Sequence, residues 1–456
     1  MTHANPTIRR LAWLQCASTL LLVALSLFWG TTPTVARLPR EWMPVAYAPV
    51  LCIATCVPVM LLMWIARAPA DVTVADERLI ARTGLVSVVL ACAATPIAGD
   101  AWNYLLNGRQ FISGANPYYQ LISDAEVEAV HLPSRVALMT YGPVWAWLSA
   151  ALVWLSAGSA TVQYLLLKLV ALSSWLVMVR STAEVIRERS CAVRARASVL
   201  LGWLPTVVFF GLAEAHNDML VAAGVALWMR GRVRTSVWSG IPLAVVTFVK
   251  YSTGPLVGLA IVDACLRRRW REAGITLLAA LGSALTVLPF WQGPGYFDGL
   301  RRLAGYPAMF SVSAAVHAVI VGGARLGEGA HLAVLWSVRL VIIGAVVPAT
   351  RRAMASPQFD RIVALAAVMT TALILMWSVV LPYYFIWLLP LVVVAPKTWV
   401  WPAVLAPMLW CGLFQVLWFV GPLSRFLSYA SVVAYGSGLL VLIATRWSSR
   451  RDEAQA

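Results

Sequence analysis

Long apolar runs joined by short basic connections constrain this chain more than any other feature of its sequence. Residues 11–30, 46–66 and 160–179 are examples. Each run has roughly the 17 to 25 residues that an α-helix needs to cross the hydrocarbon layer of a bilayer. None shows the two-residue alternation of a barrel strand, and backbone groups inside a bilayer must pair within their own segment. The sequence therefore predicts an all-α polytopic membrane protein.

The composition agrees with this prediction and argues against nucleic acid as a partner. Hydrophobic residues make up 61% of the chain and charged residues only 12%, whereas soluble domains carry about 25% charged residues. The net charge is +16, from 35 basic and 19 acidic residues. In a soluble protein this excess would indicate nucleic acid. Here the basic residues cluster between apolar runs, as the positive-inside rule requires, so we expect the bilayer and no nucleic acid as partner.

The arginine clusters orient the predicted helices. If Arg9 and Arg10 lie in the cytoplasm, alternating crossings put Asp100 on the opposite, outer side. The same alternation keeps the later basic clusters in the cytoplasm, at residues 67–82, 187–196, 230–234 and 267–271.

Two apolar segments break this charge pattern if they cross the bilayer. The first is 142–157, which is rich in tryptophan, and the second is 311–325. We predict that both stay on the outer side, with 142–157 lying along the membrane interface. The result is a bundle of about 14 transmembrane helices with juxtamembrane helices outside.

We therefore expect a multi-pass protein of the plasma membrane with both termini in the cytoplasm. Residues 1–456 form one predicted domain. It consists of N-terminal helices (1–98), a first outer loop with its juxtamembrane helix (99–158), and the remaining helices and outer loops (159–456).

Polar and aromatic residues collect on the predicted outer side. Ionisable groups near the membrane are costly, so they are candidates for function. These candidates are Asp100, Trp102, Asn103, Tyr104, Tyr141, Glu214, His216, Asn217, Asp218, Lys250, Arg301, Arg302, His317 and Tyr384.

Five short motifs carry these residues in a fixed order: GDAWNYLLNGRQFISGANPYY, TYGPVWAWL, AEAHNDML, VKYSTGPL and YYFIWLLPL. In this order the chain resembles the GT-C superfamily, and within it the polyprenol-phosphate-mannose-dependent mannosyltransferases of the MptA/MptB and PimE type (glycosyltransferase family 87 and relatives). The resemblance extends from about residue 95 to residue 395. One departure is that two additional crossings precede the acidic residue.

The resemblance implies a GT-C fold whose cavity opens to water and bilayer on the outer face. It implies a polyprenyl-phosphate-linked sugar donor and an inverting transfer to an extracytoplasmic glycolipid or glycan. Mannose comes from the resemblance alone; arabinose and glucose donors fit the same physical requirements, and a protein acceptor also stays open.

An inverting transfer needs one base that takes the proton of the attacking hydroxyl, because a phosphate leaving group needs no acid. A glycosidase would need two carboxylates. We assign Asp100 as this base. Cations and donors then stabilise the departing phosphate, and the candidates are Lys250, Arg301, Arg302, His216 and Tyr384. The remaining candidates would bind sugar or acceptor: Trp102, Asn103, Tyr104, Tyr141, Glu214, Asn217, Asp218 and His317.

Each assignment has a structural alternative. Asp100 could simply end a helix, and Asn217 or Asp218 could cap one. Lys250 could extend to the membrane interface, and Tyr384 could belong to an interfacial aromatic belt.

Two other functional classes compete with a glycosyltransferase. A transporter or flippase for lipid-linked sugars would need charges within helices, and Lys168 and Arg339 are the candidates. A metal-dependent oligosaccharyltransferase-like enzyme would bring Asp100 and Glu214 or Asp218 onto one divalent cation. We expect no cofactor and assign no metal ligand, with a divalent metal left open.

Overall fold

The computed structural model describes residues 4–29, 43–95, 100–121, 138–305, 328–355, 358–377 and 380–394. Every regular element in these ranges is helical, and none of them contains a strand. This confirms the all-α prediction. The chain forms two compact units, Met1–Arg302 and Leu303–Ala456. The finer division of the first 158 residues stays a prediction.

Six helices in the described ranges are long and apolar enough to cross a membrane. The count of about 14 crossings stays a prediction, because the helices expected at 398–418 and 428–446 lie outside the described residues. The segment 311–325, with His317, lies outside them too. The six spans are Pro6–Leu27, Pro49–Arg67, Ala160–Val185, Cys191–Ala213, Trp270–Phe290 and Phe359–Met376.

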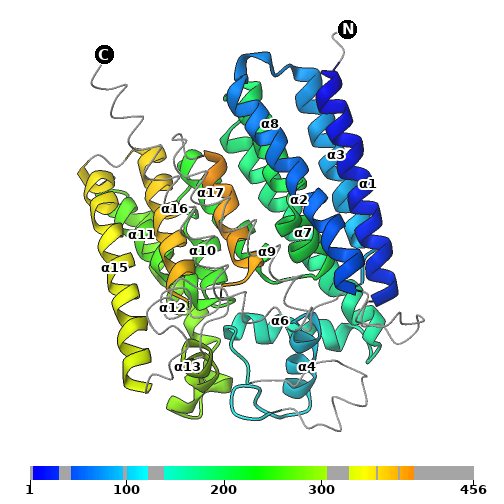
Figure 1. Cartoon of the computed structure of the whole chain (residues 1–456). Coiled ribbons are helices and arrows are strands. Elements are labelled where there is room, and N and C mark those ends of the chain that lie inside the picture. The colour runs from blue at the N-terminus through cyan, green and yellow to red at the C-terminus, as the bar shows by residue number, and fades with distance from the viewer. Residues whose placement is uncertain are drawn as a thin grey trace. The chain divides into compact units, whose positions relative to one another are not determined.

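The first unit begins with a bundle of long helices that lie side by side (Figure 1). The helix α3 contacts both α1 and α8, and α2 contacts α1 and α8 as well. A capping box of Thr73 and Asp76 fixes the start of α3. The members of this bundle are α1 (Pro6–Trp29), α2 (Met43–Arg67), α3 (Val74–Cys92), α7 (Ala160–Val185) and α8 (Cys191–Gly202), with the short η2 (Pro69–Asp71) before α3.

A π-helix replaces the second half of the helix predicted at 197–213. The α-helix α8 ends at Gly202, and Pro205 precedes η3 (Thr206–Ala213), which is wound as a π-helix and fully buried. Proline lacks the N–H that a continuous α-helix needs at this point. π-Helical turns are rare and concentrate at functional sites. This one leads directly into the turn that holds His216.

Shorter helices complete the first unit. The helix α9 packs along α7, and α10 packs against α9 and α12. The helix α10 has only seven residues, so the helix predicted over 236–249 is longer than the one that forms. The elements are α9 (Asp218–Val233), α10 (Ile241–Thr247), η4 (Tyr251–Thr253), α11 (Gly254–Leu266), α12 (Trp270–Leu285), η5 (Leu288–Phe290), η6 (Pro294–Phe297) and α13 (Asp298–Gly305).

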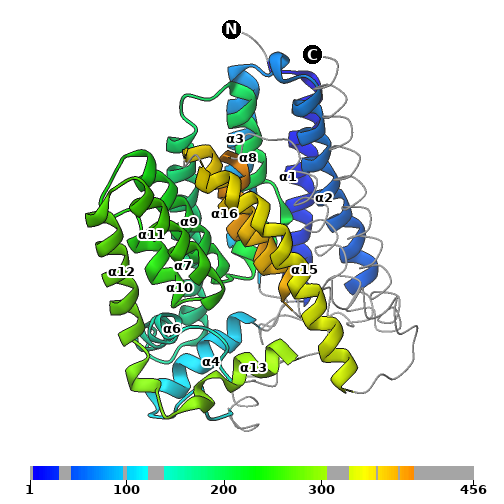
Figure 2. The same cartoon turned by 90° about the vertical axis from the view of Figure 1, so that its left-hand side faces the viewer.

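Two short helices pack against each other at the end of the first unit away from the N-terminus (Figures 1 and 2). They are α4 (Asp100–Ile112) and α6 (Pro143–Leu155). They approach closely at Gly108, where an added Cβ would lie 2.6 Å from the backbone of Ser149. The place of α6 relative to a bilayer stays a prediction. The helix α4 is a difference from the sequence prediction, which has a loop there.

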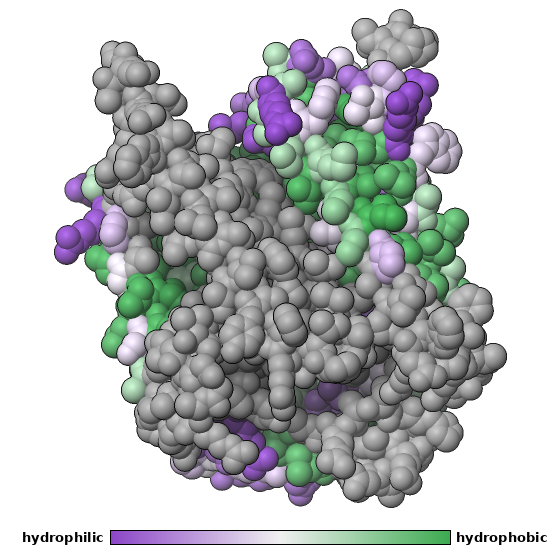
Figure 3. Space-filling model, viewed as in Figure 1, coloured by the Kyte–Doolittle hydropathy of each residue, from purple (hydrophilic) through white to green (hydrophobic). Residues whose placement is uncertain are grey.

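The basic clusters gather at the opposite end of the first unit. Ion pairs link the helix ends there: Arg194 with Glu77 at 2.8 Å, Arg230 with Glu184 at 2.7 Å, and Arg232 with Asp263 at 2.6 Å. Figure 3 shows hydrophilic residues near the N-terminal end of this unit and a hydrophobic zone beside them. The arginine clusters and Asp100 therefore lie at opposite ends of the first unit, as the charge pattern predicts.

The second unit contains α15 (Glu328–Ala355), α16 (Phe359–Met376), η7 (Pro382–Leu388) and α17 (Leu389–Val394). The helix α15 packs along α16, and η7 contacts both α16 and α17. Arg339 on α15 donates from Nε to the carbonyl oxygen of Met376 at 3.2 Å. This cation therefore caps the last turn of the neighbouring helix, where a positive charge is favourable.

Candidate active site

Asp100 and His216 approach each other although 116 positions separate them in the sequence. Asp100 occupies the first turn of α4, where the helix dipole stabilises a negative charge. Its Oδ2 lies 3.7 Å from Nδ1 of His216; the carboxylate is 29% exposed and the imidazole is fully buried. Tyr104, one turn later on α4, places its hydroxyl 3.3 Å from the same Nδ1. The carboxylate is thus supported on one side and accessible on the other.

Burial favours the neutral form of the His216 imidazole. Burial lowers the pKa of His216, and the charges of Asp100 and Asp218 only partly oppose this effect. Burial likewise raises the pKa of Tyr104 well above its usual value, so the phenol keeps its proton. His216 and Tyr104 are thus polar neighbours of Asp100 whose neutral forms burial favours, and Lys250 also interacts electrostatically with this carboxylate.

Lys250 forms a buried ion pair with Asp218. Its Nζ lies 2.8 Å from Oδ1 of Asp218, and the two side chains are 12% and 0% exposed. Burial lowers the pKa of Lys250, while the carboxylates of Asp218 and Asp100 counteract that effect. The ammonium also lies 5.9 Å from the ring centre of Tyr141. The Lys250 side chain is therefore paired inside the protein, and its role in the site stays a prediction.

Asn217 does not cap α9 with its side chain. It is the N-cap residue but makes no side-chain capping hydrogen bond. The amide is 2% exposed, and neither its oxygen nor its nitrogen has a hydrogen-bond partner among the described residues. An unsatisfied buried polar group costs about 1–3 kcal/mol. A ligand or water at this turn would relieve that cost, which makes Asn217 a candidate for binding.

Backbone hydrogen bonds join the second and fourth motifs. Gly142 donates its N–H to Val249 O at 2.9 Å, and Val144 donates to Phe248 O at 3.0 Å. A Cβ on Gly142 would lie only 2.1 Å from the Phe248 oxygen. Only glycine permits this approach, which places Tyr141 beside Lys250. The glycine of TYGPVWAWL is therefore required by packing, and Pro143 starts α6 at the position that helices tolerate for proline.

The aromatic residues of the first two motifs pack mainly on each other. The ring of Tyr104 lies edge-on to the rings of Tyr141 and Trp145, with centres 5.0 Å apart in each case. Trp102 stacks on Tyr164 at 5.5 Å. Trp102 and Tyr104 are buried, whereas Tyr141 is half-buried. Among the three predicted sugar-binding rings, Tyr141 has the most surface available to a ligand.

Tyrosines beside the site form a network that the sequence analysis did not predict. Tyr118 donates to the carbonyl oxygen of Tyr141 at 2.9 Å and stacks on Tyr296 at 4.2 Å. The hydroxyls of Tyr296 and Tyr251 are 2.6 Å apart. Tyr118 belongs to ANPYY, the end of the first motif, and Tyr251 follows Lys250 in the fourth motif. Both tyrosines could therefore have been selected as candidates from the motifs. The network ties the segment after α12 to the neighbour of Lys250.

Residues 12–266 match a family model described as alpha-(1->6)-mannopyranosyltransferase, N-terminal domain. The matched segment is more than half of the 456-residue chain and contains Asp100, His216 and Lys250. The chain belongs to the MptA/MptB mannosyltransferase family. No curated protein and no solved structure matches.

Membership in this family confirms the resemblance and the assignment as a glycosyltransferase. Four of the five motifs that carried the resemblance lie together in the first unit of this mannosyltransferase. Tyr104 links the first to the third, Gly142 links the second to the fourth, and Lys250 links the fourth to the third. The fifth motif forms η7 in the second unit, where Tyr384 is 8% exposed.

The remaining predicted residues of the mannosyltransferase lie as follows. Asn103 is half-buried on α4, and Glu214 is buried at the end of η3. Arg301 pairs with Asp298 at 2.9 Å, with side chains 62% and 46% exposed, and Arg302 is exposed as well. The pair on α13 has the character of a solvated surface pair. The roles of these residues stay predictions.

The described residues contain no group of three or more His, Cys, Asp or Glu side chains that could hold a metal ion. Asp218, one of the two carboxylates considered as a partner for Asp100 on a cation, is engaged by Lys250 instead. The expectation that the enzyme needs no metal stays a prediction.

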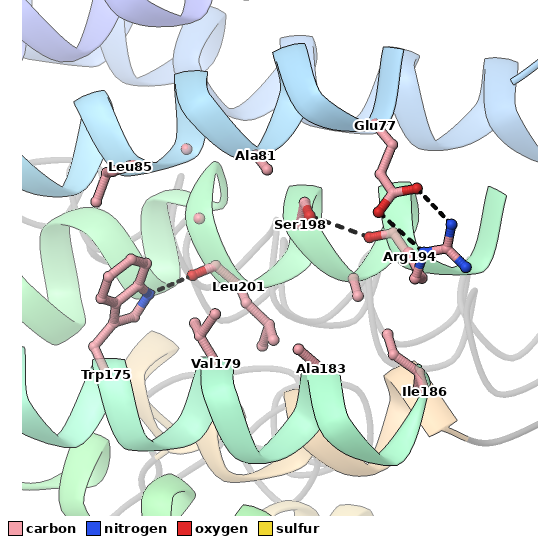
Figure 4. A pocket seen from close by; sticks show the side chains of 13 residues that line it. Glu77, Ala81, Leu85, Trp175, Val179, Ala183, Ile186, Arg194, Ser198 and Leu201 are labelled. Atoms are coloured by element: carbon pink, nitrogen blue, oxygen red, sulfur yellow. Dashed lines mark hydrogen bonds and ion pairs between the residues drawn. The ribbon is translucent and has the colours of Figure 1, made fainter. Parts of the chain in front are cut away.

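A cavity of about 160 Å³ lies far from these residues, between α3, α7 and α8 (Figure 4). Arg194 stands at its polar end and donates to Glu77, to the backbone of the α7–α8 turn and to Cys191. These bonds occupy its guanidinium, so Arg194 joins α3 to the start of α8. Glu77 and Ser198 also line the cavity; Glu77 is paired with Arg194, and the Ser198 hydroxyl donates to the Arg194 carbonyl oxygen at 3.1 Å.

Proposed function

We propose that this protein transfers mannose from a polyprenyl-phosphate donor to the 6-hydroxyl of a mannose-bearing glycan or glycolipid, with inversion at C1. The supporting observation is the convergence of Asp100, His216 and the Lys250–Asp218 pair from three separate segments of the family-matched region. A partly accessible carboxylate beside a neutral imidazole is what a general base requires.

In the proposed step the Asp100 carboxylate takes the proton of the acceptor hydroxyl. The acceptor oxygen forms a bond to C1 of the donor sugar from the face opposite the phosphate. The bond between C1 and the phosphate oxygen breaks, and its electron pair leaves with polyprenyl phosphate. One carboxylate is sufficient, because the leaving phosphate needs no proton. The family description names an alpha product, so inversion requires a beta-linked donor.

His216 supports the base without neutralising it. A protonated imidazole 3.7 Å from Asp100 would stabilise the carboxylate and weaken it as a base. Burial favours the neutral form of His216. In this proposal His216 and Tyr104 hold the carboxylate in the orientation that faces the acceptor hydroxyl.

Lys250 is our first candidate for the departing phosphate. Its amine is ion-paired with Asp218 and interacts electrostatically with Asp100, and both carboxylates favour its charged form against the effect of burial. As negative charge grows on the leaving oxygen, a preorganised cation in a dry site stabilises it more than water would. Arg301, Arg302 and Tyr384 stay secondary candidates for the same task.

The positive-inside rule assigns the side of the membrane. The arginine end of the first unit would face the cytoplasm. Asp100 lies at the other end, so the proposed reaction takes place on the extracytoplasmic face. Six apolar helices among the described residues agree with a membrane protein, and α4 and α6 would then lie along the outer interface.

Lys168 and Arg339, the cations considered for a transporter, bind backbone carbonyl groups instead; Lys168 is buried and Arg339 is half-buried. Lys168 donates to the carbonyl oxygens of Ala91 and Cys92 at 3.2 and 2.9 Å. Arg339 donates to Met376. Both cap the ends of neighbouring helices, which favours a structural explanation over a transport path.

The test offers the purified protein polyprenyl-phosphate mannose, glucose and arabinose, each with a mannoside acceptor, and measures release of polyprenyl phosphate. We expect release from the mannose donor only when acceptor is present, with an alpha linkage to O6 in the product by NMR. Retention of the rate in EDTA would separate this mechanism from a metal-dependent one. Absence of release with every donor, together with exchange of lipid-linked sugar across liposomes, would overturn the proposal in favour of a transporter.

A further inference from the structure

Tyr164 on α7 contacts three segments that lead into the active site. Its hydroxyl donates to the carbonyl oxygen of Ala213 at 2.7 Å and lies 3.4 Å from that of Ala94. Its ring stacks on Trp102 at 5.5 Å with an interplanar angle of 28°. Ala94 follows the end of α3, Ala213 ends the π-helix η3, and Trp102 lies in the first turn of α4.

Lys168 lies one turn further along α7, so it shares a face of the helix with Tyr164. Its ammonium donates to the carbonyl oxygens of Ala91, Cys92 and Ala94, and its side chain is buried. The last carbonyls of a helix lack partners within the helix, and a cation there is favourable. An ammonium has three donors, and all three are used at the end of α3.

The segments that Tyr164 and Lys168 hold are the ones that lead to Asp100 and His216. The chain passes from Ala94 to Asp100 within six residues, and from Ala213 to His216 within three. Trp102 belongs to the same helical turn as Asp100. A single helix, α7, therefore holds both sides of the Asp100–His216 contact, through Tyr164 and Lys168.

We propose that Tyr164 and Lys168 are positioning residues that set the separation of Asp100 and His216. This inference rests on the proposed function, because the separation matters only if Asp100 acts as the base. Misplacing a reacting group by about 1 Å costs on the order of 10²-fold in rate. The separation of 3.7 Å between the two side chains leaves little margin for movement of either segment.

A purely structural role predicts a different pattern. If the two residues only stabilised the bundle, their replacement would lower the unfolding temperature and the yield of folded protein. The turnover of the folded fraction would be unchanged. A positioning role lowers kcat of the folded enzyme more than it changes the donor KM, because Lys250, the first candidate for the donor phosphate, lies outside both anchored segments.

Three variants and one control separate these roles. Tyr164→Phe keeps the ring on Trp102 and removes only the hydroxyl; Lys168→Met removes the donors to α3; Lys168→Arg restores donors. The control is Trp175→Phe, also on α7, whose indole N–H donates to Leu201 O at 2.6 Å, a residue outside both segments. Each protein is examined by hydrogen–deuterium exchange of peptides covering 88–95 and 209–218 and by steady-state transfer.

We expect Tyr164→Phe and Lys168→Met to exchange faster in these peptides and to lose about tenfold or more in kcat. The donor KM should stay within twofold, Lys168→Arg should recover most of the rate, and Trp175→Phe should resemble the wild type. Unchanged exchange, or faster exchange with unchanged kcat, would overturn the inference. If the wild-type protein transfers no sugar, the proposed function fails; exchange identical to wild type in the variants would independently refute the anchoring.

Discussion

The ammonium of Lys250 and the carboxylate of Asp218 form an ion pair at 2.8 Å, with the Asp218 side chain completely buried. Charges taken out of water gain little net energy from pairing, but removing one partner leaves the other uncompensated at a cost of about 3–5 kcal/mol. Breaking the pair therefore costs stability. It lies beside Tyr141 and Asp100, where the amine of Lys250 is available to a departing phosphate.

Replacing one partner of this pair should be worse for stability than replacing both. We expect Lys250→Met to lower the unfolding temperature strongly, because Asp218 is then buried without a counter-charge. The double variant Lys250→Met/Asp218→Leu should recover most of the stability but not the transfer activity. Thermal unfolding in detergent measures the first effect. Arg234→Gln, at a 57% exposed side chain, is the control and should change little.

A phosphate role for Lys250 makes a separate kinetic prediction. The variant Lys250→Ala should raise the donor KM or lower donor turnover more than it affects the acceptor KM. Steady-state kinetics with each substrate varied in turn measures this. An equal loss for both substrates would assign Lys250 to the architecture of the site rather than to the phosphate.

His216 should make stability depend on pH. Burial lowers its pKa in the folded protein, whereas the unfolded chain has the ordinary value of about 6.5. The stability contributed by neutral His216 is therefore fully present above about pH 6.5 and is lost as pH falls through the folded-state pKa. The wild-type free energy of unfolding should fall more steeply than that of His216→Gln between pH 6.5 and 5, by up to about 1.4 kcal/mol per pH unit. Equal slopes would show that His216 does not titrate in this way.

Gly142 should tolerate no side chain. The variant Gly142→Ala places a Cβ 2.1 Å from Phe248 O, so the segment before Lys250 must move. We expect a lower unfolding temperature and a loss of about 10²-fold in transfer from the folded enzyme. Gly258→Ala on α11 has open space at its Cβ and should be neutral or slightly stabilising, because alanine favours a helix. Wild-type activity of Gly142→Ala would contradict the close approach.

The orientation in the membrane can be tested by cysteine labelling in a variant whose seven native cysteines are replaced by alanine. Ser159 lies between α6 and α7 at an exposed position, and Ser190 lies at the arginine end, also exposed. We expect an impermeant thiol reagent to label Ser159→Cys in intact cells and Ser190→Cys only after permeabilisation. The reverse pattern would mean that α6 crosses the membrane or that the whole orientation is inverted.

Sequence reasoning predicted the helical class and the separation of arginines from the site residues, because apolar length and charge bias are properties of local sequence. The prediction that 142–157 does not cross the bilayer, made from the charge of the following helix, stays a prediction. Sequence reasoning missed that Asp100 starts a helix, since the polar residues of α4 read as a loop. It also missed the π-helix before His216, whose winding depends on burial rather than on composition.

The site was predicted as a set of candidates rather than as an arrangement. The motifs contained Asp100, His216, Asp218 and Lys250, but no pattern indicated that Lys250 pairs with Asp218. Lys168 was an isolated cation in an apolar run, and its three carbonyl partners belong to another helix. Tyr164 had no signal at all. Such contacts depend on which helices become neighbours, which one-dimensional periodicity does not encode.

The assignment of Asp100 as the base is tested most directly by the variant Asp100→Asn, which keeps the shape of the side chain and removes its basicity. Release of polyprenyl phosphate in the presence of acceptor should fall by about 10²- to 10⁴-fold, with folding and donor binding retained. Asp71→Asn, at an exposed aspartate in η2, should turn over like the wild type. Turnover by Asp100→Asn at the wild-type rate would contradict the account.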